Sequence, residues 1–516
     1  MTQAIQSYQC SIDHDLHAAL QRFWVQEEAQ LSAQTIFSIE EQKCEDHFCN
    51  SHSRNSSKRY VVRLPFQKSP KAIGDSRPAA SRMLSSMIRR FSCDHKLKCL
   101  YSDFLREYES LGHMTRVPES IPEPQQFYYL PHHGVLKESS SSTKLRVVFN
   151  GSCRTSSGCS LNEGDLHIGA KLQTDLSDVI LWWRQFSYVF SADMEKMFRQ
   201  ILVHPDDLRF QRILWSPESS QKTLIYQLAT VTYGLGPAPF LANRVMKQLT
   251  KDEGHRFPLA TDVLLRGTYV DDCFGGADSP QDANEVIQQL DNLCKSGGFD
   301  LLKWTANDST ILADLSIMRH ASSTSIFLDG SPLFRTLGII WNPVSDAFVF
   351  LAINTENDTT PTKRKVLSRI AQVFDPVGWL ALITVRAKIF MQELWLTKLY
   401  WDDQLPESLS QRWNQFLNQL QDISHISIPR WNGTSANMLT LEIHGFSDAS
   451  RDAMAAVVYL RVLNKTNDAT ISLITAKTKV APIKKMTIPW LELCAATLLT
   501  KQVAHVGEVL NISQAP

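Results

Sequence analysis

The sequence has no excess of either charge, because Lys plus Arg and Asp plus Glu each number 53 among its 516 residues. A chain without net charge cannot attract nucleic acid through its overall field, so any such surface must come from local asymmetry. Its ten cysteines include no Cys-x-x-Cys pair. This scatter favours free thiols in a reducing compartment over a disulfide framework.

A long uninterrupted apolar run is also absent from the sequence. The most apolar stretch, residues 377–399, contains Arg386, Lys388 and Glu393, which argues against a membrane span. Polar residues at 13–15 occupy the place of the apolar core of a secretory leader, so we expect no such leader. The length, with 43% hydrophobic and 21% charged residues, predicts a globular chain of about two to four domains.

A pair of adjacent acids, Asp271 and Asp272, is the most informative feature that is present. β-branched and aromatic residues precede the pair at 268–270, and an apolar residue and two glycines follow at 274–276. This pattern predicts a hairpin with two carboxylates at its turn. Neighbouring carboxylates repel each other unless cations lie between them, and a pair of Mg²⁺ ions would also clamp a phosphoryl group. Asp-Asp followed by Gly is equally ordinary turn chemistry, so the pair alone leaves both interpretations open.

A third acid, Asp193, ends an apolar run at 188–192 that is typical of a buried strand. A helix-like pattern of apolar residues follows it. A carboxylate at a strand-to-helix junction, followed later by a carboxylate hairpin, is the layout of a polymerase palm. On these motifs the chain resembles a reverse transcriptase, and its flanking sequences resemble those of BEL/Pao long-terminal-repeat retrotransposons.

The resemblance covers most of the chain from residue 60 onward and implies an α+β fold. Its parts would be a right hand of fingers, palm and thumb, a helical connection and an incomplete ribonuclease H-like α/β domain. The expected boundaries are an N-terminal connector at 1–59, fingers and palm at 60–341, thumb and connection at 342–435, and the partial ribonuclease H-like domain at 436–516.

Within the connector, Cys44, His47, Cys49 and His52 form a cluster of possible metal ligands. Their spacings are tighter than those of usual zinc modules, and no second ligand pair follows at finger distance. We therefore favour a helix end that passes into a linker over a zinc site.

The resemblance implies that two strands around a serine-rich turn form the fingers hairpin. Lys137, Lys144 and Arg146 are the cations of this segment, and they would neutralise an incoming triphosphate. Arg146 is the strongest candidate, because guanidinium grips phosphate oxygens in pairs, and Lys137 is the second. A hairpin with merely exposed cations is the alternative.

Three further nucleotide-binding candidates follow from the resemblance. Phe198 would stack under the sugar of the incoming nucleotide and exclude a 2′-hydroxyl, although a helix-face aromatic could equally be core. Gly234 precedes a helix and would let the backbone approach a base pair closely. Lys303 would lie near the leaving pyrophosphate, with an exposed strand lysine as the alternative.

Near the end, an alternating strand delivers Asp448, strands follow at 454–462 and 470–477, and a helix carries Glu492. This order resembles the first half of a ribonuclease H fold, in which Asp448 and Glu492 would be two of the metal-binding acids. The sequence ends at Pro516 before later acids occur, so we expect an incomplete domain without ribonuclease H activity.

The resemblance therefore implies an RNA-directed DNA polymerase that uses two Mg²⁺ ions held by Asp193, Asp271 and Asp272 to extend a primer 3′-hydroxyl. Its partners would be an RNA and DNA template-primer and deoxynucleoside triphosphates, with no membrane. Its place would be a cytoplasmic retroelement particle, with the nucleus as an alternative, and the oligomeric state stays open.

Two alternatives come from other classes of protein. The first is a catalytically silent fragment of a retroelement that only binds RNA, which missing termini would favour. The second is an aspartic peptidase, because Pao polyproteins carry one. That chemistry needs Asp-Thr-Gly or Asp-Ser-Gly, and the sequence offers only Asp329-Gly330-Ser331, in the wrong order.

Overall fold

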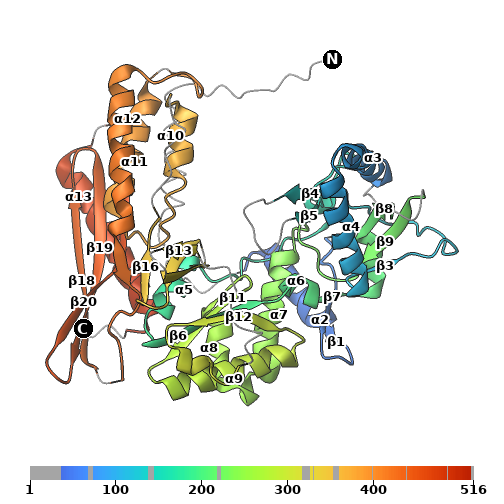
Figure 1. The fold of residues 1–516 in the computed structure, drawn as a ribbon, viewed down its shortest axis with the longest axis horizontal. Helices are drawn as coiled ribbons and strands as arrows, with labels where there is room; N and C mark the ends of the chain where they lie inside the picture. Colours follow the sequence, from blue (N-terminus) through green and yellow to red (C-terminus); the bar gives the residue numbers. More distant parts are fainter. Residues whose placement is uncertain are drawn as a thin grey trace.

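The computed structural model describes most of the chain, namely residues 37–67, 74–136, 145–217, 222–315, 326–328, 331–336, 338–351, 360–397, 399–436, 438–484 and 486–512. Figure 1 shows a lower part built on a small sheet, from which one part rises on the right and another, containing the C-terminus, on the left. The predictions for Lys137, Lys144, Asp329 and Gly330 lie outside the described residues.

Helices and strands are both well represented, which confirms the α+β composition. The helices are α2 (Ile39–Ser51), α3 (Arg77–Cys93), α4 (His95–Ser110), α5 (Leu176–Trp183), α6 (Met197–Gln200), α7 (Ala238–Glu253), α8 (Pro258–Arg266), α9 (Pro280–Ser296), α10 (Lys363–Ile370), α11 (Ala381–Leu396), α12 (Glu407–Leu420) and α13 (Ile488–Val509). Over the described ranges, none of these helices combines the length and apolarity needed to cross a membrane.

The strands of the described chain are β1 (Ser53–Arg54), β2 (Tyr60–Val62), β3 (Met114–Arg116), β4 (His132–Leu136), β5 (Leu145–Phe149), β6 (Tyr188–Met194), β7 (Leu202–Val203), β8 (Arg212–Trp215), β9 (Leu224–Leu228), β10 (Thr268–Tyr269), β11 (Asp272–Ala277), β12 (Leu301–Ala306), β13 (Ile326–Leu328), β14 (Ser331–Thr336), β15 (Ile339–Asn342), β16 (Ala347–Val349), β17 (Ser427–Pro429), β18 (Met438–Ala449), β19 (Ala453–Asn464) and β20 (Ala469–Val480). Most neighbouring strands follow each other in sequence, but β2 pairs with β7, β3 pairs with β9, and β6 lies between β11 and β12.

The central sheet has the strand order β10-β11-β6-β12, and its neighbouring strands are antiparallel. Its middle strand β6 is the apolar run predicted at 188–192. Because side chains alternate along a strand, Phe190 and Ala192 enter a main core shared with α7 and α9. Val189 enters a second core on the other face. Burial on both faces fixes the register of β6 and hence the place of its last polar residue.

Helix α2 ends at Ser51, as the predicted helix end requires, and packs against α7. Cys44 and Phe48 are buried in the main core, and Arg244 of α7 donates to the Glu45 carboxylate at 2.7 Å. After α2 the chain forms β1, which pairs with β2. The expected linker is therefore wrong for residues 51–57, because Arg54 ties this polar segment to Glu253 at 2.7 Å.

The right-hand part of Figure 1 is built from α3, α4, the β4–β5 hairpin and the β3-β9-β8 sheet. Leu97, Tyr101 and Leu105 form the buried stripe of α4. The Tyr101 hydroxyl also shares a hydrogen bond of 2.5 Å with Nδ1 of the buried His132 in β4. This contact fixes the hairpin against the helix.

Three helices, α10 to α12, form the upper left part with a core of their own around Val366, Leu394, Trp413 and Leu417. The first residues of α10 are cationic, and they form hydrogen bonds with other residues of this chain. Lys363 donates to two backbone carbonyls across from it, so this cation serves the helix packing.

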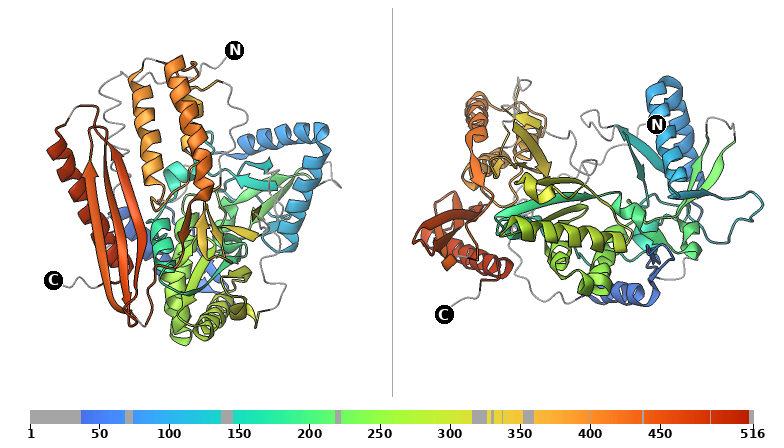
Figure 2. Two further views of the ribbon diagram at one scale, coloured as in Figure 1. Left: turned by 60° about the vertical axis from the view of Figure 1, so that its left-hand side comes forward. Right: turned by 60° about the horizontal axis from the view of Figure 1, so that its bottom comes forward.

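The C-terminal sheet has three long antiparallel strands in the order β18-β19-β20, with α13 beside them (Figure 2). The predicted strands at 454–462 and 470–477 and the following helix are confirmed. Leu491 and Ala495 of α13 pack on Met454 of β19. Among the described residues, β18 pairs only with β19, and its Leu439 and Phe446 are exposed.

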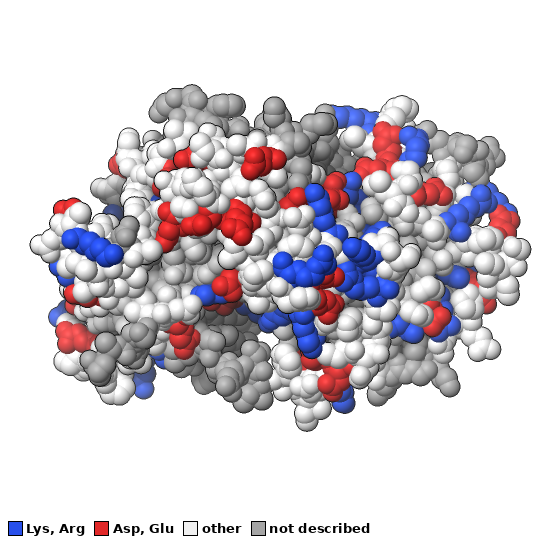
Figure 3. All heavy atoms as spheres, turned by 90° about the horizontal axis from the view of Figure 1, so that it is seen from below, with Lys and Arg blue, Asp and Glu red and all other residues white. Residues whose placement is uncertain are grey.

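Charge is distributed unevenly over the surface despite the zero net charge. Seen from below (Figure 3), a group of Lys and Arg side chains lies near the middle of the face, and Asp and Glu side chains lie on both sides of it. Helices α2 and α7, which lie on the lower side in Figure 1, carry the exposed Lys43, Lys247 and Lys251. The exposed acids Glu40 and Asp46 lie on α2 as well, so this side of the surface carries both charges.

Candidate active site

Three carboxylates from two adjacent strands meet at one end of the central sheet. Asp193 near the end of β6 lies directly opposite Asp272, the first residue of β11. Asp271 lies in the turn before it, and its carbonyl accepts a hydrogen bond from the Met194 amide at 2.7 Å. The predicted carboxylate hairpin is confirmed, because Tyr269 pairs with Asp272 across the turn.

The turn of this hairpin holds Val270 in a left-handed conformation, with φ of 56°. A β-branched residue rarely adopts positive φ, and such strain costs about 1–3 kcal/mol. The side-chain oxygen of Gln173 stabilises the turn by accepting a hydrogen bond from the Val270 amide at 2.9 Å. Gln173 has no signal in the sequence, since it lies outside every motif.

Desolvation and mutual repulsion raise the pKa values of two acids. Desolvation, together with the charges of Asp271 and Asp193, raises the pKa of Asp272 to about 7. The Asp271 side chain reaches the surface, yet the surrounding atoms desolvate its carboxylate and, with Asp193, raise its pKa. The cluster therefore attracts cations, because bound positive charge would relieve both repulsions.

Lys303 supplies one such positive charge. It lies in an irregular part of β12, between the paired residues Leu302 and Thr305, and has φ of 55°. Its ammonium group contacts the Asp193 carboxylate at 3.0 Å. Lys303 is thus more than an exposed strand lysine, because the irregular backbone directs it to the acid cluster.

Arg146 faces the same cluster from the β4–β5 hairpin. It pairs with Val135 in the hairpin register and is exposed. Its charge lowers the pKa of Asp271, which shows that its guanidinium lies within electrostatic reach of the acids.

Phe198 and Gly234 have clear packing roles. Phe198 lies in the single turn of α6, just after β6, and is partly buried against the main core. Gly234 has φ of 100°, and a Cβ added there would lie 2.0 Å from the Phe149 carbonyl oxygen. Glycine is therefore required where this loop crosses the end of β5, independently of any nucleotide contact.

The C-terminal acids do not form a comparable cluster. Ala449 of β18 packs with Leu491 of α13, so alternation along β18 directs Asp448 to the opposite face of the sheet. Glu492 is exposed on α13. The structure thus places the two acids at the same end of the domain but assigns Asp448 to the face away from α13.

The possible metal sites of the chain are the central acid cluster and the Cys and His residues of α2. Throughout the described ranges, no group of three or more His, Cys, Asp or Glu side chains is arranged to hold a metal ion. The central cluster nevertheless offers carboxylate oxygens, which are the donors that Mg²⁺ prefers. In the N-terminal helix, Cys44 is buried in the core, and the Cys49 thiol donates to Glu45.

Comparison with known families identifies the class of the C-terminal part. Residues 362–515 match the family model described as the Pao retrotransposon-like RNaseH-like domain. No curated protein matches the chain. The matched part includes α10 to α12 as well as the three-stranded sheet and α13. The match supports a fragment of a Pao retrotransposon Pol protein.

Proposed function

We propose that this chain is an RNA-directed DNA polymerase of a Pao retrotransposon. The observation that supports the proposal most is the meeting of Asp193, Asp271 and Asp272 at one end of an antiparallel sheet. Carboxylates that repel one another destabilise a fold. Their retention beside two basic residues, Lys303 and Arg146, is explained if the site binds cations and a polyanionic substrate.

The residues of the site divide into those that hold metal and those that bind phosphate. Asp193 and Asp271, with Asp272 beside them, would hold two Mg²⁺ ions that activate the primer 3′-hydroxyl and stabilise the leaving pyrophosphate. Arg146 would donate paired hydrogen bonds to the triphosphate. Lys303 would exchange its contact with Asp193 for one with the pyrophosphate.

The test is primer extension on poly(rA)/oligo(dT) with deoxythymidine triphosphate and the purified full chain. Extension is expected with Mg²⁺ and is expected to stop when EDTA is added, because the acids cannot act without the ions. The proposed partners are thus an RNA and DNA template-primer and deoxynucleoside triphosphates. Absence of extension under all metal conditions would contradict the proposal.

A silent RNA-binding fragment is the second candidate. The contact between Lys303 and Asp193 favours it, because one acid of the cluster already has a cationic partner at 3.0 Å. A fragment of this kind would bind the template-primer without extending it. Binding measured in the same reactions therefore separates the two candidates.

A further inference from the structure

The second hydrophobic core is shared by the central sheet and the RNase H-like sheet. Val179 and Trp183 of α5 belong to it, together with residues of β6 and β11. Val458 and Leu460 of β19 and Val506 of α13 belong to the same core. Separating the two sheets would expose these apolar side chains of both parts to water, which is unfavourable.

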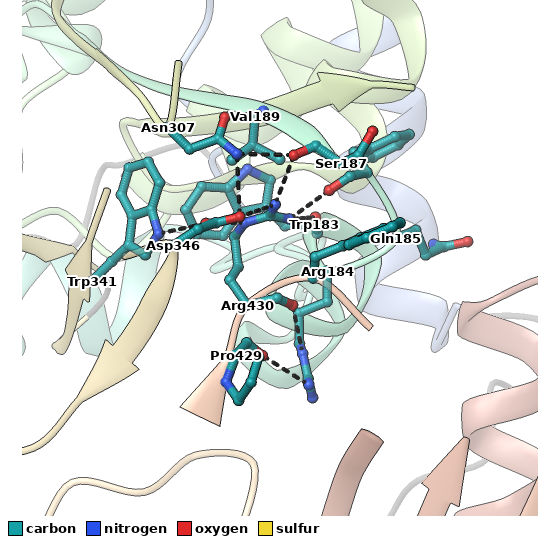
Figure 4. Close-up of polar contacts among 12 residues, drawn as sticks. Trp183, Arg184, Gln185, Ser187, Val189, Asn307, Trp341, Asp346, Pro429 and Arg430 are labelled. Carbon is teal, nitrogen blue, oxygen red and sulfur yellow. Dashed lines mark hydrogen bonds and ion pairs between the residues drawn. The ribbon is translucent and has the colours of Figure 1, made fainter. Parts of the chain in front are cut away.

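Arg430, which directly follows β17, is a fully buried link to the central sheet. Its guanidinium forms a two-point contact with Asp346, at 2.7 and 2.6 Å. The same group donates to the carbonyls of Trp183, Phe186 and Ser187, the residues that lead into β6. Figure 4 shows the Arg430 side chain pointing toward Asp346 and Ser187.

Arg184 is a second buried link, running in the opposite direction. It leaves the end of α5 and donates to the carbonyls of Arg430 at 2.9 Å, Pro429 at 3.1 Å and Leu473 of β20 at 2.7 Å. Its guanidinium also lies 5.2 Å from the centre of the Trp379 ring. Arg184 thus ties the end of α5 to β17 and, through Leu473, to the RNase H-like sheet.

We infer that the RNase H-like sheet and α13 serve as a structural support of the central sheet, and that Arg430 and Arg184 are positioning residues for β6. Removing the partners of a buried guanidinium is strongly destabilising. Separating the two sheets would remove the Leu473 partner of Arg184, and Arg430 holds the segment after β17 that Arg184 also contacts. The consequence for catalysis rests on the proposed function, because β6 carries Asp193.

Hydrogen exchange of the full chain in increasing denaturant tests the support directly. Amides of β6 and β19 should lose protection in the same cooperative opening, with the same denaturant dependence. Arg430→Met should lower the protection of both strands by a similar factor, roughly 100-fold or more. Arg451→Met, the same change at an exposed arginine of the RNase H-like part, should leave both unchanged.

A second variant separates charge pairing from simple loss of packing. Arg430→Met combined with Asp346→Asn should recover part of the protection, since no buried charge is then left without its partner. It also keeps the inference testable if Arg430→Met alone does not fold. Loss of protection in β19 at lower denaturant than in β6, or an Arg430→Met effect confined to one strand, would overturn the inference.

Activity gives a readout that distinguishes this inference from the proposed function. If the chain extends primers, the double variant should recover extension in parallel with protection. If the chain extends no primer while β6 and β19 still open together, the polymerase proposal fails and the structural support stands.

Discussion

Asp193 and Asp272 face each other directly across adjacent antiparallel strands. Like charges in opposite positions destabilise a sheet pair, and here a third carboxylate, Asp271, is added beside them. Desolvation and these like charges together raise the pKa of Asp272 to about 7. The sheet thus holds an arrangement that is unfavourable for folding and favourable for binding cations.

Asp272→Asn should stabilise the metal-free chain. The pKa of Asp272 is higher in the folded state than in the unfolded state, so stability falls as pH rises from about 4 to about 7. Removing the charge should gain roughly 1–3 kcal/mol at neutral pH, measured by denaturant unfolding in EDTA. Asp262→Asn, at an exposed acid of α8, is the control. Equal stability of Asp272→Asn and wild type would contradict the repulsion.

If the chain is the proposed polymerase, Phe198→Ala should let it accept ribonucleotides, because the ring that would exclude the 2′-hydroxyl is removed. The variant will also be less stable, because Phe198 loses its contacts with the core. The measurement is therefore the ratio of ribonucleotide to deoxynucleotide incorporation, which does not depend on the amount of folded chain. Phe127→Ala removes another partly buried ring from the same core and should leave the ratio unchanged. An equal ratio in wild type and Phe198→Ala would assign Phe198 to packing alone.

His505 should make the interface between α5 and α13 sensitive to pH. Its imidazole contacts the Asp178 carboxylate at 2.8 Å, and this contact raises the pKa of His505. A raised folded-state pKa contributes stability that is present below the unfolded value and is lost as pH rises through the folded value. His505→Gln should flatten the fall in denaturant midpoint as pH rises from about 6.5 through the raised pKa of His505.

The exposed His425 offers the matched control for this pH dependence. His425→Gln should keep the wild-type profile. A profile that is the same in His505→Gln and wild type would show that the Asp178 contact does not contribute to folding.

The chain should not hydrolyse RNA in an RNA–DNA hybrid. Two-metal hydrolysis needs a cluster of acids on one side of the sheet, whereas alternation directs Asp448 away from α13 and Glu492. The test is incubation of a labelled hybrid with the full chain and Mg²⁺. Cleavage that disappears in Asp448→Asn would contradict this account.

The sequence predicted the elements whose signal is local. The apolar run of β6, the carboxylate hairpin after Tyr269 and the start of the helix α13 each depend on a few neighbouring residues. The position of Lys303 was also predicted near the site. Its contact with Asp193 was not, because that contact depends on an irregularity of β12 that no residue pattern marks.

Contacts between distant segments could not be predicted. Arg184 and Arg430 are separated by 246 residues, and each looked like an ordinary charged residue in its own segment. The docking of α2 was missed for the same reason, since Glu45 finds its partner Arg244 only in the folded chain. Gly234 was predicted as special, but the structure gives the reason as the Phe149 carbonyl.

Primer extension by Asp271→Asn, measured at equal template-primer binding, tests the central claim most directly. Asn keeps the shape of the side chain and removes the charge that a metal ion needs. The account predicts that wild type extends the primer with Mg²⁺ and that the variant binds the duplex normally but loses extension by at least about 100-fold. Extension by Asp271→Asn at a rate close to that of wild type would contradict the assignment of this acid cluster as a polymerase site.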